Sequence, residues 1–303
     1  MNKRIALLTA ALLIGLASPA LAQDNASTAS RVAPNARVAE TTKSKPIKKS
    51  VRKKAKTRNA KKSARAPRFI GNSNFNLATN GFSFANWQGE PISQDTSLSL
   101  LVQLFGEQSI CQEITAESGC VPFAKAAQFS EQLALSIAAG RCEGMSVLAS
   151  SLFARGANAA SLSQSEVESE ILYWWASQIL PSVTEVSRKT RQLDPVELLP
   201  LILKGISQGA SSTLGLYNQG QGHTLLPFKS SQAGNVVTID VYDSNTPGIP
   251  QQLVINTTKK SWTYQSFDAS GQSTLLWSGI GAGSLDVVPL SARQPQATSY
   301  FNQ

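Results

Sequence analysis

Residues 140–156, GRCEGMSVLASSLFARG, place a cysteine at the start of a predicted helix. The apolar residues after Cys142 recur at spacings of three and four and so form one helix face: Met145, Leu148, Ala149, Leu152 and Phe153. Arg155 and Gly156 then end the helix. The amides and the dipole of a helix N-terminus favour a thiolate. Cys142 is therefore a candidate nucleophile, and the alternative is a thiol buried as a small apolar residue.

The first 22 residues have the pattern of a secretory signal peptide. Lys3 and Arg4 precede an apolar run, and residues 20–22, Ala-Leu-Ala, fit the cleavage motif. The run is too short to span a bilayer, so we expect no transmembrane segment. The sequence predicts an exported protein, periplasmic or extracellular, that begins at Gln23 after cleavage.

A basic segment follows the signal peptide. Residues 31–68 contain 15 Lys/Arg and one acid, whereas residues 69–303 contain 11 Lys/Arg and 17 Asp/Glu. The segment has few large apolar residues, so we expect residues 23–68 to be a disordered tail. We expect residues 43–68 to bind an anionic polymer of the cell envelope or a membrane surface. Nucleic acid is not expected, because the tail lacks interleaved aromatic residues.

The remaining residues, 69–303, suffice for one globular domain with a substantial core. The chain has three cysteines, and an exported protein can form disulfides. Cys111 and Cys120 lie in one short polar segment, CQEITAESGC, and we predict that they pair. Cys142 is then the unpaired thiol, which needs a structural or chemical reason in an oxidising compartment.

The single histidine, His223, begins the first strand of a predicted β-hairpin. Residues 222–248, GHTLLPFKSSQAGNVVTIDVYDSNTPG, contain two strand-like runs joined by QAGN. A turn centred near Ala233 would place His223 directly opposite Asp243 and would leave Asp240 on the other face of the sheet. An unpaired cysteine, a histidine and a facing carboxylate form the set of nucleophile, base and orienting group.

These two segments resemble the papain-like cysteine peptidase superfamily, in particular its bacterial double-glycine-leader peptidase and transglutaminase-like branches. The resemblance implies an α+β fold with the cysteine on a helical half and His and Asp on an antiparallel half. It implies a thiol hydrolase or acyltransferase that acts on peptide or amide bonds of a peptide or protein substrate. In the family's roles, Cys142 attacks the acyl carbon, His223 carries the proton and Asp243 orients the histidine, with Asn245 as the reserve orienting residue.

One position departs from the family pattern. Papain-like peptidases carry a glutamine six residues before the cysteine, which helps to form the oxyanion hole, and Ser136 stands there. The nearest glutamines are Gln128 and Gln132. This departure keeps two other classes open: a non-catalytic envelope-binding module on the same fold, and a structural protein in which Cys142 is only buried.

The other segments indicate packing rather than chemistry. We expect the aromatic residues of 80–90, NGFSFANWQGE, to pack across the entrance to the domain, and the alternative is that they line a cleft. We expect Trp174 and Trp175 to pack in the core rather than to bind a ligand. Asp194 and Pro195 fit the N-cap and first residue of a helix, and four strand-like runs follow Asp243. No cluster has the ligand spacing of a metal site and no glycine loop opens a helix, so we expect neither a metal nor a cofactor.

Overall fold

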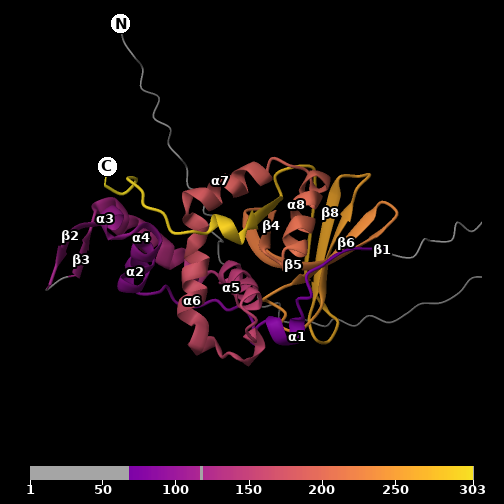
Figure 1. Ribbon diagram of the computed structural model, residues 1–303, viewed down its shortest axis with the longest axis horizontal. Helices are drawn as coiled ribbons and strands as arrows, with labels where there is room; N and C mark the ends of the chain where they lie inside the picture. Colours follow the sequence, from indigo (N-terminus) through magenta and orange to yellow (C-terminus); the bar gives the residue numbers. More distant parts are fainter. Residues whose placement is uncertain (1–67, 117–118, 303) are drawn as a thin grey trace, which may run out of the picture. The chain divides into compact units, whose positions relative to one another are not determined.

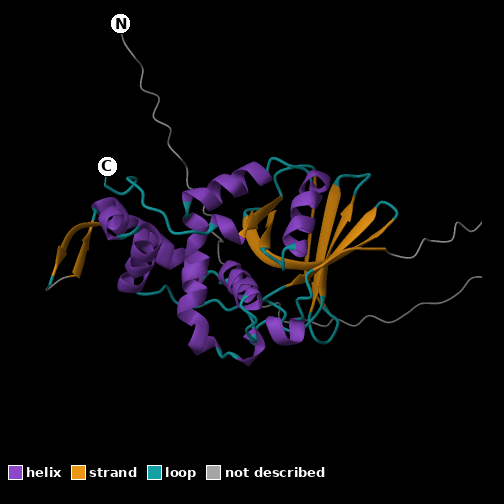
Figure 2. Ribbon diagram, in the orientation of Figure 1, coloured by secondary structure: helices purple, strands orange, loops and turns teal. Residues whose placement is uncertain are grey.

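Helices occupy most of the first half of the described chain, and strands occupy most of the second half (Figure 2). The computed structural model describes residues 68–116 and 119–302, which belong to one compact unit. The predicted signal peptide and the predicted tail through residue 67 lie outside these residues. Arg68, which we assigned to the tail, is the first residue of a strand. The combination of helices with an antiparallel sheet is an α+β fold, as predicted.

The helices are α1 (Leu77–Asn80), α2 (Gln94–Phe105), α3 (Glu107–Ile110), α4 (Ala124–Ala138), α5 (Cys142–Ala154), α6 (Gln164–Ala176), α7 (Pro181–Thr190) and α8 (Pro195–Ser207). Three short 3-10 helices are η1 (Ala159–Ser161), η2 (Ser177–Ile179) and η3 (Leu290–Ala292). The strands are β1 (Arg68–Asn72), β2 (Cys111–Thr115), β3 (Gly119–Pro122), β4 (Ser212–Asn218), β5 (Gln221–Ala233), β6 (Val236–Tyr242), β7 (Gln251–Asn256), β8 (Ser261–Phe267), β9 (Ser273–Ile280) and β10 (Leu285–Pro289).

The cap predicted at the start of α8 is confirmed. The Asp194 side chain accepts hydrogen bonds from the amides of Val196 at 2.8 Å and Glu197 at 3.1 Å, and the Glu197 carboxylate accepts from the Asp194 amide at 2.9 Å. Pro195 occupies the first helical position, where its missing N–H costs nothing. These bonds satisfy orphan amides of the first turn, and they fix where the helix begins.

Helix α5, which carries Cys142, lies between α6 and the sheet (Figure 1). It begins at Cys142 and ends at Ala154, Arg155 is the C-cap, and Gly156 follows with φ +71°, the left-handed conformation that terminates helices. Residues 144–150 are all buried, so α5 is covered on more than the one face that its apolar spacing predicts. Its neighbours on both sides leave it little freedom to move.

The large sheet has the strand order β10-β4-β5-β6-β7-β8-β9, with β1 paired to β5, and the ladders are antiparallel. It curls so that β9 comes back to contact β4. Strand β5 is long and changes partner: residues 221–225 pair with β4, and residues 226–233 pair with β6. This bend places the first residues of β5 near both α5 and β9.

Three apolar clusters fill the fold. One joins α2, α4, α6 and α7, and it includes the buried Trp175. A second fills the curled sheet beneath α8. The third packs α5 against the aromatic residues Phe75, Phe82 and Tyr242, and Trp87 of the 80–90 segment packs against it. Trp175 is therefore core, as expected, Trp174 is half-buried against the third cluster, and the 80–90 segment packs against α5.

The predicted hairpin exists, but its predicted register is wrong. The turn is Gly234–Asn235, with Ala233 paired to Val236, rather than a turn centred on Ala233. Gly234 has φ +60°, which glycine adopts without strain in a two-residue hairpin turn. A bulge between Pro227 and Lys229 then shifts the ladder by one residue in the opposite sense. The net error beyond the bulge is two residues, which preserves the face that each side chain occupies.

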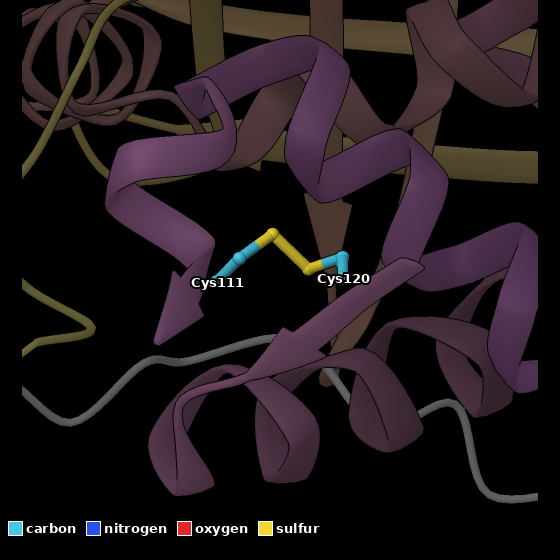
Figure 3. The surroundings of a disulfide bond; sticks show 2 residues. All are labelled: Cys111 and Cys120. Carbon is cyan, nitrogen blue, oxygen red and sulfur yellow. A yellow bond between two sulfur atoms is a disulfide. The ribbon is translucent and has the colours of Figure 1, made fainter. Parts of the chain in front are cut away.

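The predicted disulfide is confirmed. Cys111 at the start of β2 is bonded to Cys120 on β3, and their Cα atoms are 5.3 Å apart (Figure 3). The bond closes a two-stranded hairpin that is separate from the large sheet. Among the helices of the described residues, none is both long and apolar enough to cross a membrane.

Candidate active site

Cys142 is the first residue of α5 and is a free, half-buried thiol. The first amides of a helix have no acceptor within the helix, and Cys142 lies among these amides at the start of α5. Arg141 precedes it as the cap residue and is itself buried, with its guanidinium 4.6 Å from the centre of the Trp87 ring and Nη1 donating to the Trp87 carbonyl at 3.0 Å. The start of α5 is thus anchored to the 80–90 segment.

Two glycines, Gly140 and Gly144, flank Cys142 at the start of α5. A Cβ on Gly144 would lie 2.1 Å from the carbonyl oxygen of Ile171, so glycine at this position permits the close approach of α5 and α6. Gly140 has φ +146° and would bring a Cβ to 3.3 Å from Asn86 Nδ2. Both glycines therefore place the helix, and the thiol environment follows from that placement.

His223 lies on the first part of β5, where its backbone partner is Leu216 of β4. The side chain is 6% exposed and meets the Trp277 ring of β9 edge to face, with ring centres 6.4 Å apart. Nε2 donates to Asp243 Oδ1 at 2.9 Å, and the Cys142 side chain lies close enough to the same ring to raise its pKa. With Nε2 used by the carboxylate, Nδ1 is the nitrogen that remains for the thiol.

Asp243 follows directly after β6 and is 1% exposed. The last pair of the β5–β6 ladder is Leu226 with Tyr242, so Asp243 reaches His223 diagonally and not as a direct cross-strand partner. Two further donors hold the carboxylate: the Asn245 amide at 2.8 Å to Oδ1, and the Tyr264 hydroxyl to Oδ2. Tyr264, on β8, is a site residue that the sequence reasoning missed.

The charges of the site reinforce one another. Burial opposes protonation of His223. The neighbouring Asp243 and Cys142 side chains outweigh this effect and raise the pKa of the ring well above 6.5. Burial also opposes ionisation of Asp243, but the His223 charge and the three donors lower the pKa of that carboxyl below 3.8. The arrangement favours an imidazolium held against an ionised carboxylate, with the Cys142 side chain on the same ring.

Asn245, the reserve orienting residue, supports the loop and does not contact the ring through its side chain. Its Oδ1 accepts from Asn86 Nδ2 at 2.9 Å. Asn86 Oδ1 in turn accepts from the Arg141 amide at 2.7 Å, which fixes the orientation of the Asn86 side chain. Asn86 therefore links the residue before Cys142 to the loop that holds Asp243, and no local sequence pattern indicated it.

Ser136 does not take the role of the family's glutamine. It lies on α4, and its hydroxyl donates to the carbonyl of Gln132 at 2.8 Å. Gln132 and Gln128 are exposed on the same helix. Asp240 is also placed away from the site, as predicted, because its carboxylate accepts from Gln252 at 2.9 Å and lies 3.9 Å from Lys229 Nζ.

Metal ligands and large grooves do not coincide with these residues. Within residues 68–116 and 119–302, no three His, Cys, Asp or Glu side chains are grouped as metal ligands. A groove between α2 and α6, lined in part by Tyr173 and Trp174, does not include Cys142. Cys142, His223 and Asp243 are the candidate site residues that the fold brings together.

Comparison with models of protein families, with curated proteins and with solved structures finds no match for this chain. The arrangement itself has a defined chemical capacity. A half-buried thiol at a helix N-terminus meets a buried imidazole that is held by a buried carboxylate. Such a set can form and break a thioester while the histidine carries the proton.

Proposed function

We propose that the protein is an exported thiol hydrolase or acyltransferase of the papain-like type, acting on peptide or amide bonds through Cys142, His223 and Asp243. The observation that carries the proposal is the buried bond of 2.9 Å between His223 Nε2 and Asp243 Oδ1, with the Cys142 side chain close enough to the same ring to raise its pKa. Only one histidine and one unpaired cysteine exist in the chain, and the fold brings them together.

The proposed reaction has two halves. The Cys142 sulfur attacks the acyl carbon, and the C–N bond breaks as His223 gives its proton to the leaving amine. Water or an amine then attacks the thioester, His223 takes a proton from it, and the thiolate leaves. The Asp243 carboxylate holds the ring in one orientation throughout and balances its charge. The Cys142 amide, at the first position of α5, is the donor we assign to the developing oxyanion.

The substrate and the location extend the proposal. The chain carries the pattern of a signal peptide, and residues 43–68 are strongly basic, so we place the protein at an anionic envelope polymer or membrane surface outside the cytoplasm. A peptide or protein of that environment is the proposed substrate class. The disulfide between Cys111 and Cys120 agrees with an oxidising location.

The test is covalent labelling with a thiol-directed acyl probe. We expect the wild type to be acylated at Cys142, and we expect His223→Ala to lose at least nine-tenths of the labelling rate. Asp240→Ala is the matched control, because this carboxylate bonds Gln252 on the sheet and should leave the rate unchanged. Wild-type labelling as slow as that of His223→Ala would contradict the proposal.

One observation favours a second candidate, a non-catalytic envelope-binding module on the same fold. Ser136 uses its hydroxyl inside α4, so no side chain replaces the family's oxyanion glutamine at that position. A module of this kind would bind anionic surfaces, would not turn over an acyl probe, and would keep its binding in Cys142→Ala. Acyl transfer from the labelled Cys142 to water or to an amine excludes it.

A further inference from the structure

The residues that follow Cys142 and His223 in the chain are bonded to each other. Glu143 follows Cys142 on α5, Thr224 follows His223 on β5, and the Thr224 hydroxyl donates to Glu143 Oε2 at 2.5 Å. One hydrogen bond therefore joins the helix and the strand immediately beside the thiol and the ring. Because it connects the two backbones one residue from each reacting side chain, it fixes their separation directly.

A second bond, one helical turn further along, sets the rotation of α5. The Ser146 hydroxyl donates to the Thr224 carbonyl at 3.3 Å. Residues four apart lie on the same face of a helix, so Cys142 and Ser146 face the same side. The contact of Ser146 with β5 thus turns Cys142 toward the strand that carries His223.

A buried arginine from the C-terminal segment completes the cluster. Arg293, just after η3, donates from Nη2 to Glu143 Oε1 and, at 3.2 Å, to the Thr213 hydroxyl, while its Nη1 donates to the Ser177 hydroxyl at 3.1 Å. The Arg293 side chain is fully buried and that of Glu143 is 13% exposed. Through its guanidinium, Arg293 therefore links η2 and β4 to the Glu143 carboxylate on α5.

A buried ion pair of this kind is a poor device for stability alone. Removing two charges from water costs free energy that their attraction often fails to recover, and an apolar pair of similar volume is frequently as stable. In some proteins such pairs instead specify one arrangement among several. Here the arrangement that is specified is the position of α5 against β5.

We infer that Glu143, Thr224 and Arg293 form a positioning clasp that holds the Cys142 thiol against the His223 ring, and that the C-terminal segment is thereby part of the active site. The inference rests on the proposed function for its biological meaning. Its physical content, the coupling of Cys142 to His223 through the clasp, is measurable without turnover. None of the three clasp residues touches the reacting atoms.

Because the chain has a single histidine, its imidazole signals can be assigned to His223 without ambiguity. Proton NMR of the full exported chain without an affinity tag reports one imidazole, and titration gives the pKa of His223. Cys142 raises this pKa, so Cys142→Ala should lower it, and the size of that drop measures the coupling. We expect Thr224→Val to reduce the drop by at least half, and Thr224→Ser, which keeps the hydroxyl, to restore it.

A second variant and a control separate positioning from folding. Glu143→Gln combined with Arg293→Met removes both charges together and should reduce the drop as Thr224→Val does. Asp194→Ala is the matched control, because it removes the side chain bonded to Lys260 at 2.7 Å and to the first amides of α8. It should lower the melting temperature while leaving the drop unchanged.

The outcomes distinguish the clasp from the hydrolase. A full drop in folded Thr224→Val and in the double variant overturns the clasp, even if the wild type is acylated. A reduced drop in a protein that no acyl probe labels supports the clasp and refutes the hydrolase. A wild type in which Cys142→Ala leaves the His223 pKa unchanged overturns both.

Discussion

Tyr264→Phe isolates one hydrogen bond at the buried carboxylate. Asp243 is 1% exposed and has three donors: His223, the Asn245 amide and the Tyr264 hydroxyl. Phenylalanine keeps the ring and its packing, so the substitution removes a donor without opening a cavity. A hydrogen bond to a charged group contributes about 1.5–3 kcal/mol. For a domain of this size each kcal/mol shifts the melting temperature by about 2–4 °C, so we expect a loss of about 3–12 °C.

The destabilisation caused by Tyr264→Phe should depend on pH, and its direction follows from the pKa of Asp243. The pKa of the Asp243 carboxyl is lowered below 3.8, so its contribution is complete above that value and is lost as the pH falls through the folded-state pKa. The Tyr264 bond serves the ionised form. The difference in melting temperature between wild type and Tyr264→Phe should therefore be full at neutral pH and should shrink in acid.

The assay is thermal unfolding followed by circular dichroism from neutral to acidic pH. Tyr173→Phe is the matched control, because the Tyr173 hydroxyl makes no hydrogen bond to any residue that the structure describes, and it should change the melting temperature little. A Tyr264→Phe protein as stable as wild type at neutral pH would refute the reasoning. So would a loss of the same size at every pH, because the cause would then be packing and not the carboxylate.

Three other predictions concern the frame of the site. Gly144→Ala should lower the free energy of unfolding in urea by about 3 kcal/mol, because a Cβ there would lie 2.1 Å from the α6 backbone. Gly89→Ala is the control and should be neutral, because a Cβ there would lie 3.8 Å from its nearest neighbour. Equal losses in the two variants would contradict the prediction. Replacing Cys111 and Cys120 by serine should cost about 2–3 kcal/mol and leave alkylation of the third cysteine unchanged; a changed rate would couple the hairpin to the site. Deleting residues 23–67 should leave the melting temperature nearly unchanged and abolish salt-sensitive binding to anionic vesicles, and binding that persists would place it on the folded domain.

Local rules predict the parts of the site that are encoded locally. The spacing after Cys142 predicts α5, and the parity of the cysteines predicts the disulfide. The meeting of His223 and Asp243 follows from the alternation of a hairpin, although the turn was misplaced. The contact survives because turn and bulge together shift the ladder by two residues, and a shift of one or three would have turned Asp243 to the other face.

The missed residues come from distant parts of the chain. Tyr264 is 21 residues from Asp243, Asn86 is 55 from Arg141, and Arg293 is 150 from Glu143. No periodicity or motif marks them, because their partners are chosen by the curl of the sheet and by the path of the C-terminal segment. The role of Gly144 depends on the position of α6, which sequence spacing does not give.

The place of β10 in the sheet has a consequence for incomplete chains. β10 is the last strand of the described chain, and it covers the edge of β4, whose first five residues are buried. A chain that stops before residue 285 leaves β4 with a free row of amides and carbonyls beside apolar side chains. Such an edge is a template for joining another copy, strand to strand. Products shortened at the C-terminus should therefore accumulate as insoluble aggregates, and soluble, inactive monomers should be rare among them.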